Sequence, residues 1–241
     1  FMGLCPGNLH MTSQLDVHRQ EAQRDFGDPI GITSRALIEG LYGIQPDLLH
    51  DTLTIRPGFP SSWNEAALHH PDVDFTWHRE GLHETLEIVS HLPKAVDLAL
   101  ILPASTTTLP VVIANGRTVT AHFDPEAVGS PLIRIHLSAA SAWKISIQWP
   151  GVAPLAPPPL HTCSLNERVP LPHNITHALI DDPQSCLRDG LAIKPGNHTL
   201  FARIQQQDCR YWLPISLQVT APQPLLSDAV ASARSAAVVD P

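Results

Sequence analysis

The chain has 241 residues, with 15 lysines and arginines against 23 aspartates and glutamates, and a formal net charge of −8 at neutral pH. Nucleic acids and anionic membranes bind clustered basic residues, so this acidic balance argues against either partner. No run of about 18 apolar residues occurs, so we expect no membrane-spanning segment. The length suffices for one large domain or for two ordinary ones.

The best helix signal of the sequence covers residues 28–42. Asp28 can accept hydrogen bonds from the first turn, and Pro29 fits the first helical position because no backbone donor is needed there. Gly43 then provides a helix stop. We expect residues 12–25 to be helical or to form a long ordered loop. One face of the helix carries residues at helical spacing that need a partner from elsewhere, namely Ile30, Ser34, Leu37, Ile38 and Leu41.

From Leu53 onward the pattern changes to a period of two, which is typical of strands with one buried face. The segment "VDFTWH" alternates large apolar residues with polar ones, and "ETLEIV" continues the alternation. Asn115 and Gly116 suit the two positive-φ positions of a tight turn, so "VVIANGRTVTAHF" predicts a β-hairpin. About eight strands between residues 50 and 149 predict a β-sandwich.

The C-terminal third reads as a linker, a second β domain and a tail. The segment "PGVAPLAPPPL" at residues 150–160 predicts a stiff, proline-rich linker that cannot join a sheet. Strand signals with Pro-Gly turns over residues 161–221 predict a small immunoglobulin-like β domain. Residues 222–241 are rich in small side chains and are expected to be disordered.

The cysteines and histidines show no metal-binding pattern. Cys5, Cys163, Cys186 and Cys209 lack the CxxC spacing of zinc or redox sites. A disulfide between the third and fourth cysteines in an oxidising compartment and four independent thiols both fit the sequence. The closely spaced histidines lack a helical i, i+4 arrangement, and we expect most of them on exposed strand faces: His69, His70, His78, His83 and His91. We therefore expect neither a metal nor another cofactor.

The passage from the helix into the first strands resembles a known junction. The stretch "SRALIEGLYGIQPDLLHDTLTIRPGFPSSWNEAALHHPDVDFTWHREG" holds a glycine-terminated helix end, a strand ending in Ile-x-Pro and a PxxW turn. These positions are Gly40, Leu41, Gly43, Ile44, Pro46, Ile55, Pro57, Pro60 and Trp63. The junction resembles that of six-hairpin (α/α)6-barrel enzymes such as rhamnosidase-like hydrolases and cellobiose-phosphorylase-like enzymes. With "MTSQLDVHRQEAQRDFGDPIG" and the second small β domain included, the chain is most similar to a family of secreted bacterial proteins of unassigned function with this barrel-plus-sandwich plan. This resemblance covers residues 8–148 well and residues 170–219 weakly.

The resemblance implies a mainly β fold that follows the end of a helical barrel. Residues 1–43 would be the C-terminal remnant of the barrel, 44–149 the β-sandwich, and 161–221 the small domain. The chain would be the accessory, structural part of a secreted or periplasmic glycoside hydrolase acting on oligo- or polysaccharides. Its partners would be the upstream barrel and, through the full-length protein, a glycan. Alone it is expected to be inactive, and the resemblance does not identify its catalytic residues.

The polar segment ahead of the helix is the part of the chain expected to reach a substrate cleft. The candidate substrate-binding residues are Gln14, Asp16, Glu21, Arg24 and Asp25. Arginine and paired carboxylates suit contacts with sugar hydroxyls or the tuning of a partner acid. A solvated loop or salt bridges at a domain interface explain the same residues.

A self-standing carbohydrate-binding or adhesion module with tandem β-sandwich domains is the alternative function. Its sugar-stacking platform would come from Trp63, Trp77, Trp143, Trp149 and Trp212, although three of these sit at alternating strand positions that also suit a core. We expect Trp63 to be a buried anchor at the junction. A helix face packed on this chain's own sandwich would favour the module, and an exposed face would favour an absent partner domain.

Overall fold

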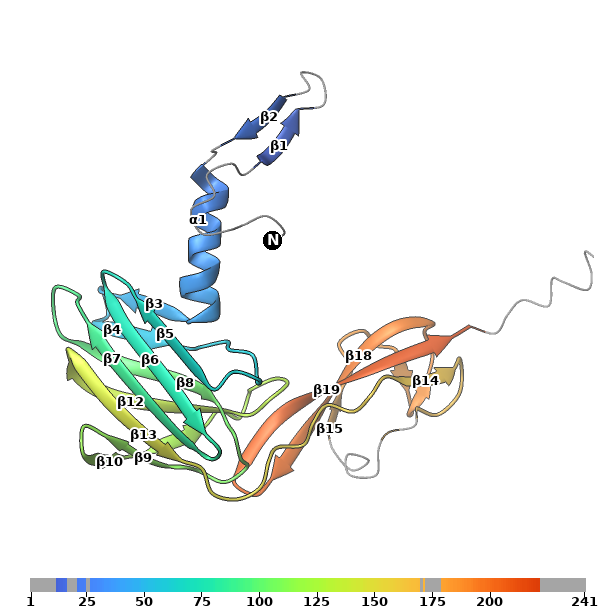
Figure 1. Cartoon of the computed structure of the whole chain (residues 1–241). Helices are drawn as coiled ribbons and strands as arrows, with labels where there is room; N and C mark the ends of the chain where they lie inside the picture. Colours follow the sequence, from blue (N-terminus) through green and yellow to red (C-terminus); the bar gives the residue numbers. More distant parts are fainter. Residues whose placement is uncertain (1–11, 17–20, 25–26, 170, 172–178, 222–241) are drawn as a thin grey trace, which may run out of the picture. The chain divides into compact units, whose positions relative to one another are not determined.

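The computed structural model describes residues 12–16, 21–24, 27–169, 171 and 179–221, with side chains from residue 31 onward. The expected tail at 222–241, Cys5 and Asp25 lie outside the described residues. The described chain is mainly β (Figure 1). It divides into two compact units: a first unit up to Phe123 that also includes Leu132–Val152, and a second unit formed by Asp124–Pro131 and the chain from Ala153 onward.

The chain begins with a hairpin and a helix. Strands β1 (Thr12–Asp16) and β2 (Glu21–Arg24) pair antiparallel, so the expectation of a helix or long loop over residues 12–25 is wrong. Pairing satisfies the backbone donors and acceptors of both strands, which outweighs the helix propensity of their Gln, Glu, Ala and Arg residues. Helix α1 (Gly27–Arg35) continues into the π-helical segment η1 (Ala36–Leu41), so the helix predicted over residues 28–42 is confirmed.

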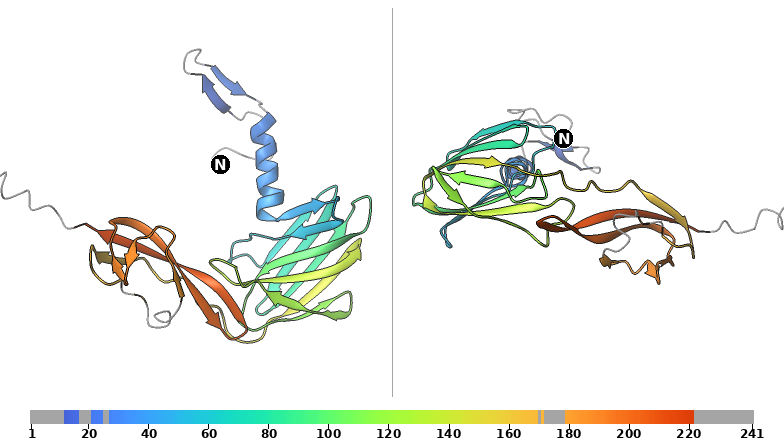
Figure 2. Two further views of the ribbon diagram at one scale, coloured as in Figure 1. Left: turned by 180° about the vertical axis from the view of Figure 1, so that it is seen from behind. Right: turned by 90° about the horizontal axis from the view of Figure 1, so that it is seen from below.

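The first unit is a β-sandwich of two sheets (Figures 1 and 2). One sheet has the strand order β10 (Arg117–Val119), β9 (Val111–Ala114), β13 (Ala142–Gln148), β7 (His83–Ser90), β6 (Val73–Glu80) and β5 (Glu65–His69). The other has the order β11 (Ala121–Phe123), β12 (Leu132–Ala140), β8 (Val96–Pro103), β4 (Thr52–Ile55) and β3 (Ile44–Asp47). Neighbouring strands are antiparallel except β4 and β8, which are parallel.

The predicted hairpin at residues 111–119 is confirmed. Asn115 and Gly116 have φ values of 48° and 78°, and they connect β9 to β10 with Ala114 paired to Arg117. Positive φ at both central positions matches the right-handed twist of the flanking strands, which explains the Asn-Gly sequence here.

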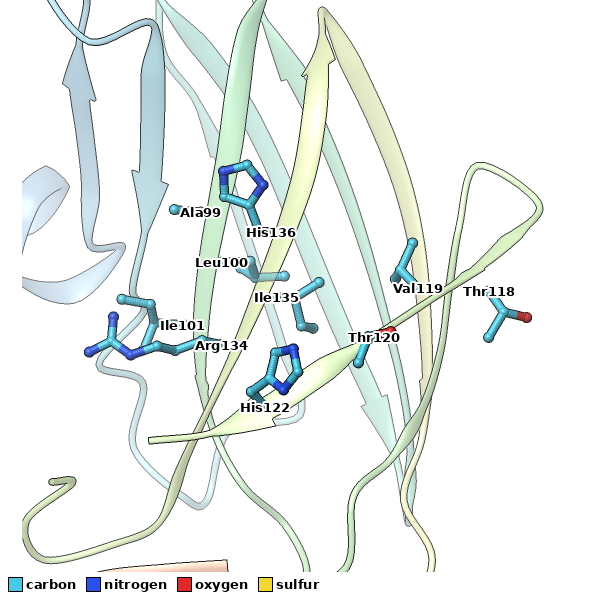
Figure 3. Close-up of a pocket in the computed structure, with 10 residues that line it drawn as sticks. All are labelled: Ala99, Leu100, Ile101, Thr118, Val119, Thr120, His122, Arg134, Ile135 and His136. Atoms are coloured by element: carbon cyan, nitrogen blue, oxygen red, sulfur yellow. The ribbon is translucent and has the colours of Figure 1, made fainter. Parts of the chain in front are cut away.

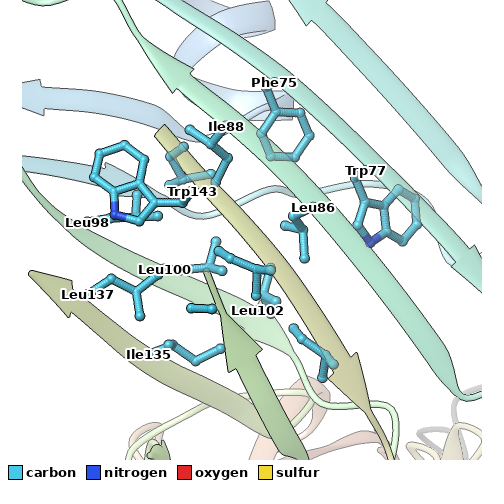
Figure 4. Close-up of a cluster of buried hydrophobic side chains, with 14 of the residues drawn as sticks. Phe75, Trp77, Leu86, Ile88, Leu98, Leu100, Leu102, Ile135, Leu137 and Trp143 are labelled. Carbon is cyan, nitrogen blue, oxygen red and sulfur yellow. The ribbon is translucent and has the colours of Figure 1, made fainter. Parts of the chain in front are cut away.

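The core lies between the two sheets, where the inward residues of successive strands meet (Figure 4). Along β6 and β7, apolar residues at every second position are buried, as the period of two predicts. The buried set includes Trp77, Trp143 and Trp149, whose exposed fractions are 6, 3 and 1%. These three tryptophans therefore belong to the core.

The second unit contains a four-stranded sheet and a small hairpin. The sheet order is β14 (His161–Ser164), β19 (Cys209–Thr220), β18 (Gly196–Gln206) and β15 (Leu179–Asp181), and the hairpin pairs β16 (Leu187–Arg188) with β17 (Leu191–Ala192). Residues 150–160 form no strand. Cys163, Cys186 and Cys209 are free thiols, so the disulfide alternative is not realised. Burial raises the pKa of Cys186 to about 11.

The segment Asp124–Pro131 lies between β11 and β12 in sequence but groups with the second unit. Its backbone pairs with β19, because the Trp212 amide donates to the Ala127 carbonyl at 2.8 Å and the Gly129 amide donates to the Trp212 carbonyl at 2.8 Å. The sandwich domain expected as one continuous stretch, 44–149, is thus interrupted by eight residues that pair elsewhere.

Candidate functional site at the helix–sandwich junction

The last turn of the helix is wider than an α-helical turn, and it places Tyr42 in the sandwich core. The Tyr42 amide donates to the Leu37 carbonyl at 3.0 Å, a separation of five residues that widens the last turn. This widening brings Tyr42 into the core, where only 8% of its surface is exposed. Its hydroxyl donates to the carbonyl of Ala67 at 2.6 Å, so a buried polar group is satisfied.

Two backbone hydrogen bonds fasten the helix end to the segment after β4. The Arg56 amide donates to the Gly43 carbonyl at 3.0 Å, and the Gly58 amide donates to the Leu41 carbonyl at 2.9 Å. Gly43 has a φ of +66°, which lets the chain turn directly from the helix into β3. Only Tyr42 and Gly43 separate the helix from β3, and the two hydrogen bonds hold the helix end against the segment that follows β4.

An aromatic cluster fills the space beside this connection. The rings of Tyr42 and Phe59 meet edge to face with centroids 5.2 Å apart, and Tyr42 makes the same contact with Phe75 at 5.8 Å. Phe59 also lies 5.2 Å from Trp77 and stacks on Trp63 at 5.8 Å. Such ring pairs contribute roughly 0.5–1.5 kcal/mol each beyond their buried area. Phe59 is the centre of the cluster, and Trp63 is its outermost ring.

The expectation that Trp63 is a buried anchor is wrong, because 39% of its surface is exposed. Phe59 already occupies the position between Tyr42 and Trp77, so the indole of Trp63 covers the outer face of Phe59 instead.

We expect Trp63→Ala to lower the free energy of unfolding by only about 1–2 kcal/mol, the value of one ring stack and partial burial. Phe59→Ala is the matched comparison and should cost about 3–4 kcal/mol, since it removes the central ring. Urea midpoints followed by far-UV circular dichroism measure both. Equal losses in the two variants would show that Trp63 anchors the junction as firmly as Phe59 does.

Over residues 31–41, the part of the helix whose side chains are described, little apolar surface is buried. Ile38 and Leu41 pack against the sandwich core at its C-terminal end. Ile32 and Leu37, however, have exposed fractions of 67 and 45%. We call the exposed apolar residues Ile32, Ala36 and Leu37 the helix face; Ile32 and Ala36 lie one turn apart, and Leu37 lies about a quarter of a turn further round the helix. Arg35 and Glu39 form an exposed ion pair at 2.9 Å, and one helical turn separates the two residues.

Sequence reasoning missed Arg79, which ties the PxxW turn to the sandwich. Its guanidinium donates to the carbonyls of Ser61 at 2.6 Å and Trp63 at 2.7 Å, and it lies 5.3 Å from the centroid of the Trp77 ring. The signal was present in β6, where the inward positions Val73, Phe75 and Trp77 continue at the same spacing to Arg79.

The tryptophans do not form the exposed platform that the module alternative requires. Three are in the core, and Trp63 is stacked on Phe59. In the second unit the Trp212 ring has the Arg203 guanidinium 4.9 Å from its centroid. The Trp212 indole donates to Glu126 at 3.0 Å, and Arg203 pairs with the same carboxylate at 2.8 Å. Trp212 is thus engaged with the segment Asp124–Pro131.

Four of the five candidate substrate-binding residues fall on the β1–β2 hairpin, and the fifth, Asp25, lies outside the described residues. Gln14 pairs with Gln23, and Asp16 pairs with Glu21, so two acidic residues occupy directly opposed backbone positions. Arg24 pairs with Thr12 at the other end. The hairpin therefore makes Asp16 and Glu21 direct neighbours across the two strands. A helix or an open loop would not pair these two positions.

Two of the five histidines between residues 69 and 91 share one carboxylate. Asp74 is bonded to His91 Nε2 and to His69 Nδ1, each at 3.0 Å. These hydrogen bonds, first that of His91 and then that of His69, hold the pKa of Asp74 below its ordinary value. In the described part of the chain, no three His, Cys, Asp or Glu side chains are placed to hold a metal ion.

The lowered pKa of Asp74 predicts a loss of stability in acid. A depressed carboxyl pKa stabilises the fold above the ordinary value of about 4, and this contribution disappears as the pH falls through the folded-state pKa. The gap in melting temperature between the natural chain and Asp74→Asn should therefore shrink as the pH is lowered from about 5 to 2. Thermal melts at unit steps of pH measure the gap, and a constant gap would contradict the prediction.

Among the described residues, no helix has both the length and the apolar character needed to cross a bilayer. No family model, no curated protein and no solved structure matches the chain.

Proposed function

We propose that the chain is the C-terminal accessory and structural region of a glycoside hydrolase-like protein that acts on oligo- or polysaccharides. In this proposal α1 and η1 form the last helix of an (α/α)6 barrel, the sandwich holds that helix in place, and the second unit is an immunoglobulin-like domain. The observation that carries the proposal is the helix face, in which Ile32 and Leu37 are 67 and 45% exposed.

A helix of this length gains most of its stability from burying an apolar side against something else. Among the helix side chains that the structure describes, from residue 31 onward, those of Ile38 and Leu41, at the sandwich end, have such a contact. The helix face is therefore suited to a partner that packs along the helix. A preceding helical domain of the same polypeptide fits best, because only two residues separate the helix from β3 and the hydrogen bonds to the carbonyls of Gly43 and Leu41 fix the last turn of the helix.

The test compares the effect of the substitution Leu37→Asp on the stability of two proteins, the 241-residue chain and a longer polypeptide that contains it. Leu37→Asp should leave the stability of the 241-residue chain within about 0.5 kcal/mol, as for other exposed positions. In a longer polypeptide, translated from the reading frame ahead of Phe1, the same change should cost about 3 kcal/mol or more by burying an unpaired carboxylate. Glu39→Gln, in the exposed ion pair on the same helix, is the matched control and should be mild in both contexts.

Hydrogen exchange gives a second measurement in the same pair of proteins. Amides of α1 should exchange quickly in the 241-residue chain and slowly in the longer polypeptide, because local opening tracks the loss of packed contacts. A reading frame without a helical region ahead of Phe1, or equal effects of Leu37→Asp in both contexts, would overturn the proposal.

The proposal also predicts that the 241-residue chain releases no sugar from plant or microbial polysaccharides. Glycoside cleavage needs a general acid together with a base or nucleophile at a defined separation, and the proposal places that pair in the preceding barrel. Reducing-sugar assays of the purified chain measure this directly. Hydrolysis by the chain alone, retained after chromatography to constant specific activity, would contradict the structural role.

A further inference from the structure

The proline-rich segment between β13 and β14 has a backbone that its own sequence restricts. Residues 153–160 have the sequence "APLAPPPL" and belong to the second unit. Each proline ring holds its φ at about −65°, and each residue before a proline is confined to extended backbone. Of residues 153–159, only Leu155 escapes both restrictions. The sequence therefore favours a polyproline II helix, which has about three residues per turn and no internal hydrogen bonds.

Two anchors hold this segment along β19 at the length that such a helix requires. The Leu155 carbonyl accepts a hydrogen bond from the Tyr211 hydroxyl at 3.3 Å, and the Leu155 amide donates to Gln206 Oε1 at 3.0 Å. Further along, His161 begins β14 and pairs in parallel with Leu217 of β19. Six residues separate the anchors on each chain segment, a span of about 19 Å as polyproline II and of about 20 Å as a strand. The equal spans show that the segment is extended beside β19 (Figure 1).

The exposure of the segment repeats every three residues, as the polyproline II period requires. One edge carries both anchors and is partly buried: Leu155, Pro158 and His161. A second edge is exposed along its whole length: Ala153, Ala156 and Pro159. The third edge is partly buried at its first residue and exposed at the other two: Pro154, Pro157 and Leu160. The second and third edges together form two alanine–proline pairs, one turn apart.

We propose that residues 153–157 are a docking segment for a partner protein with an aromatic-lined groove of the SH3 type. Such grooves bind the polyproline II conformation and recognise the pattern P-x-x-P, which Pro154 and Pro157 supply. The two alanine–proline pairs enter the groove, and the anchored edge faces away from it. Because the anchors keep the segment extended before the partner arrives, docking loses little conformational entropy. This docking is independent of the helix face and of any preceding domain.

The segment also determines the kind of contact that the partner makes. Residues 150–160 include no charged side chain, so ring packing and hydrogen bonds to backbone carbonyls provide the affinity. Binding that depends on ion pairs weakens as salt screens the charges. We therefore expect the dissociation constant to change by less than about twofold between about 0.05 and 0.5 M sodium chloride. A stronger salt dependence would show that the partner binds charged residues elsewhere on the chain.

The test titrates the 241-residue chain with a panel of purified SH3 domains and follows backbone amide shifts of the chain by NMR. We expect at least one SH3 domain to bind with a dissociation constant below about 1 mM and to shift the amides of Leu155, Ala156 and Leu160. Purified WW domains, which also bind proline-rich chains, serve as the comparison. No saturable shifts with any SH3 domain, or binding by the WW domains alone, would overturn the proposal.

Three variants of the 241-residue chain assign the binding to the exposed edges. Pro157→Ala removes an exposed ring, and Ala156→Asp places a charge against the aromatic groove, so each should weaken binding by about tenfold or more. Pro158→Ala is the matched control, because it removes the same ring from the partly buried edge, and it should change binding by less than about twofold. Equal losses in the Pro157 and Pro158 variants, with unchanged shifts outside the segment, would mean that only the stiffness of the segment matters and would overturn the proposal.

Discussion

Replacing Gly43 with alanine is expected to lower the free energy of unfolding of the first unit by at least about 4 kcal/mol, a loss seen only for severe defects. Gly43 has a φ of +66°, and a side chain in that conformation costs about 1–2 kcal/mol by itself. The larger part comes from a collision, because a Cβ added at Gly43 would overlap the carbonyl group of Arg56.

Neither side of that collision can move cheaply. The atoms that the Cβ would meet are backbone atoms of Arg56, so no side chain can swing away. The Arg56 amide donates a hydrogen bond to the Gly43 carbonyl. The sequence neighbours of these residues, Ile44 and Ile55, pair with each other across β3 and β4 and are buried in the core. Removing the collision therefore requires β3 and β4 to separate, or the helix end to detach from the segment after β4.

Substitutions at two other glycines separate the conformational cost at Gly43 from the cost of the collision. Gly81 has a φ of +58° with no atom within 4 Å of an added Cβ, so Gly81→Ala should show the conformational cost alone, about 1–2 kcal/mol. Gly40 is helical with equally open space, so Gly40→Ala should stabilise by about 0.5–1 kcal/mol. Urea unfolding followed by tryptophan fluorescence measures all three. If Gly43→Ala costs no more than Gly81→Ala, the junction is not rigid.

The junction illustrates how far local sequence reasoning reaches. The glycine after an amphipathic helix predicted a left-handed residue at Gly43, and the structure confirms its positive φ. The close approach of Arg56 was not predictable, because it depends on the register between β3 and β4, which local patterns do not determine. The same limit applies to Trp63, since Phe59 and Trp63 both stood in the turn and only packing decides which ring is buried.

The strand periodicity predicted most of the sandwich core but not the sheet edges. Alternation in β6 and β7 correctly identified the inward faces around Phe75 and Leu86. The N-terminal hairpin was missed because helix-forming side chains dominate residues 12–25, whereas pairing across a short connection decides the structure. The neighbouring positions of His122 and Arg134 (Figure 3) were not predictable, because they arise from the sheet pairing of β11 with β12.

Glu84 is an acidic residue at a position that the period of two assigns to the buried face of its strand. It shares the inward face of β7 with Leu86 and Ile88, and only 5% of its surface is exposed. A carboxyl group at such a position requires partners. Its Oε2 accepts a hydrogen bond from Trp77 Nε1 at 2.8 Å, and its Oε1 accepts one from Trp149 Nε1 at 2.9 Å.

Glu84→Ala is therefore expected to cost about 3–5 kcal/mol. The substitution leaves the indole N–H groups of Trp77 and Trp149 buried without an acceptor, at about 1–3 kcal/mol each. The hydroxyl of Ser105, which donates to Oε1 at 3.1 Å, loses its partner as well. Glu84→Gln keeps the shape but turns a donor toward one indole, so its cost should be smaller, about 1–2 kcal/mol.

Glu87 on the same strand supplies the control for this prediction. Its side chain is 59% exposed and pairs with Lys144 at 2.8 Å on the outer face of the sheet. Glu87→Ala should change the free energy of unfolding by no more than about 0.5 kcal/mol, as expected for an exposed ion pair.

Urea midpoints of the variants, with near-ultraviolet circular dichroism to report the tryptophan environments, measure the series. The expected order of loss is Glu84→Ala, then Glu84→Gln, then Glu87→Ala. An alanine at position 84 that costs no more than one at position 87 would show that the two indoles find other acceptors and that Glu84 does not organise the core.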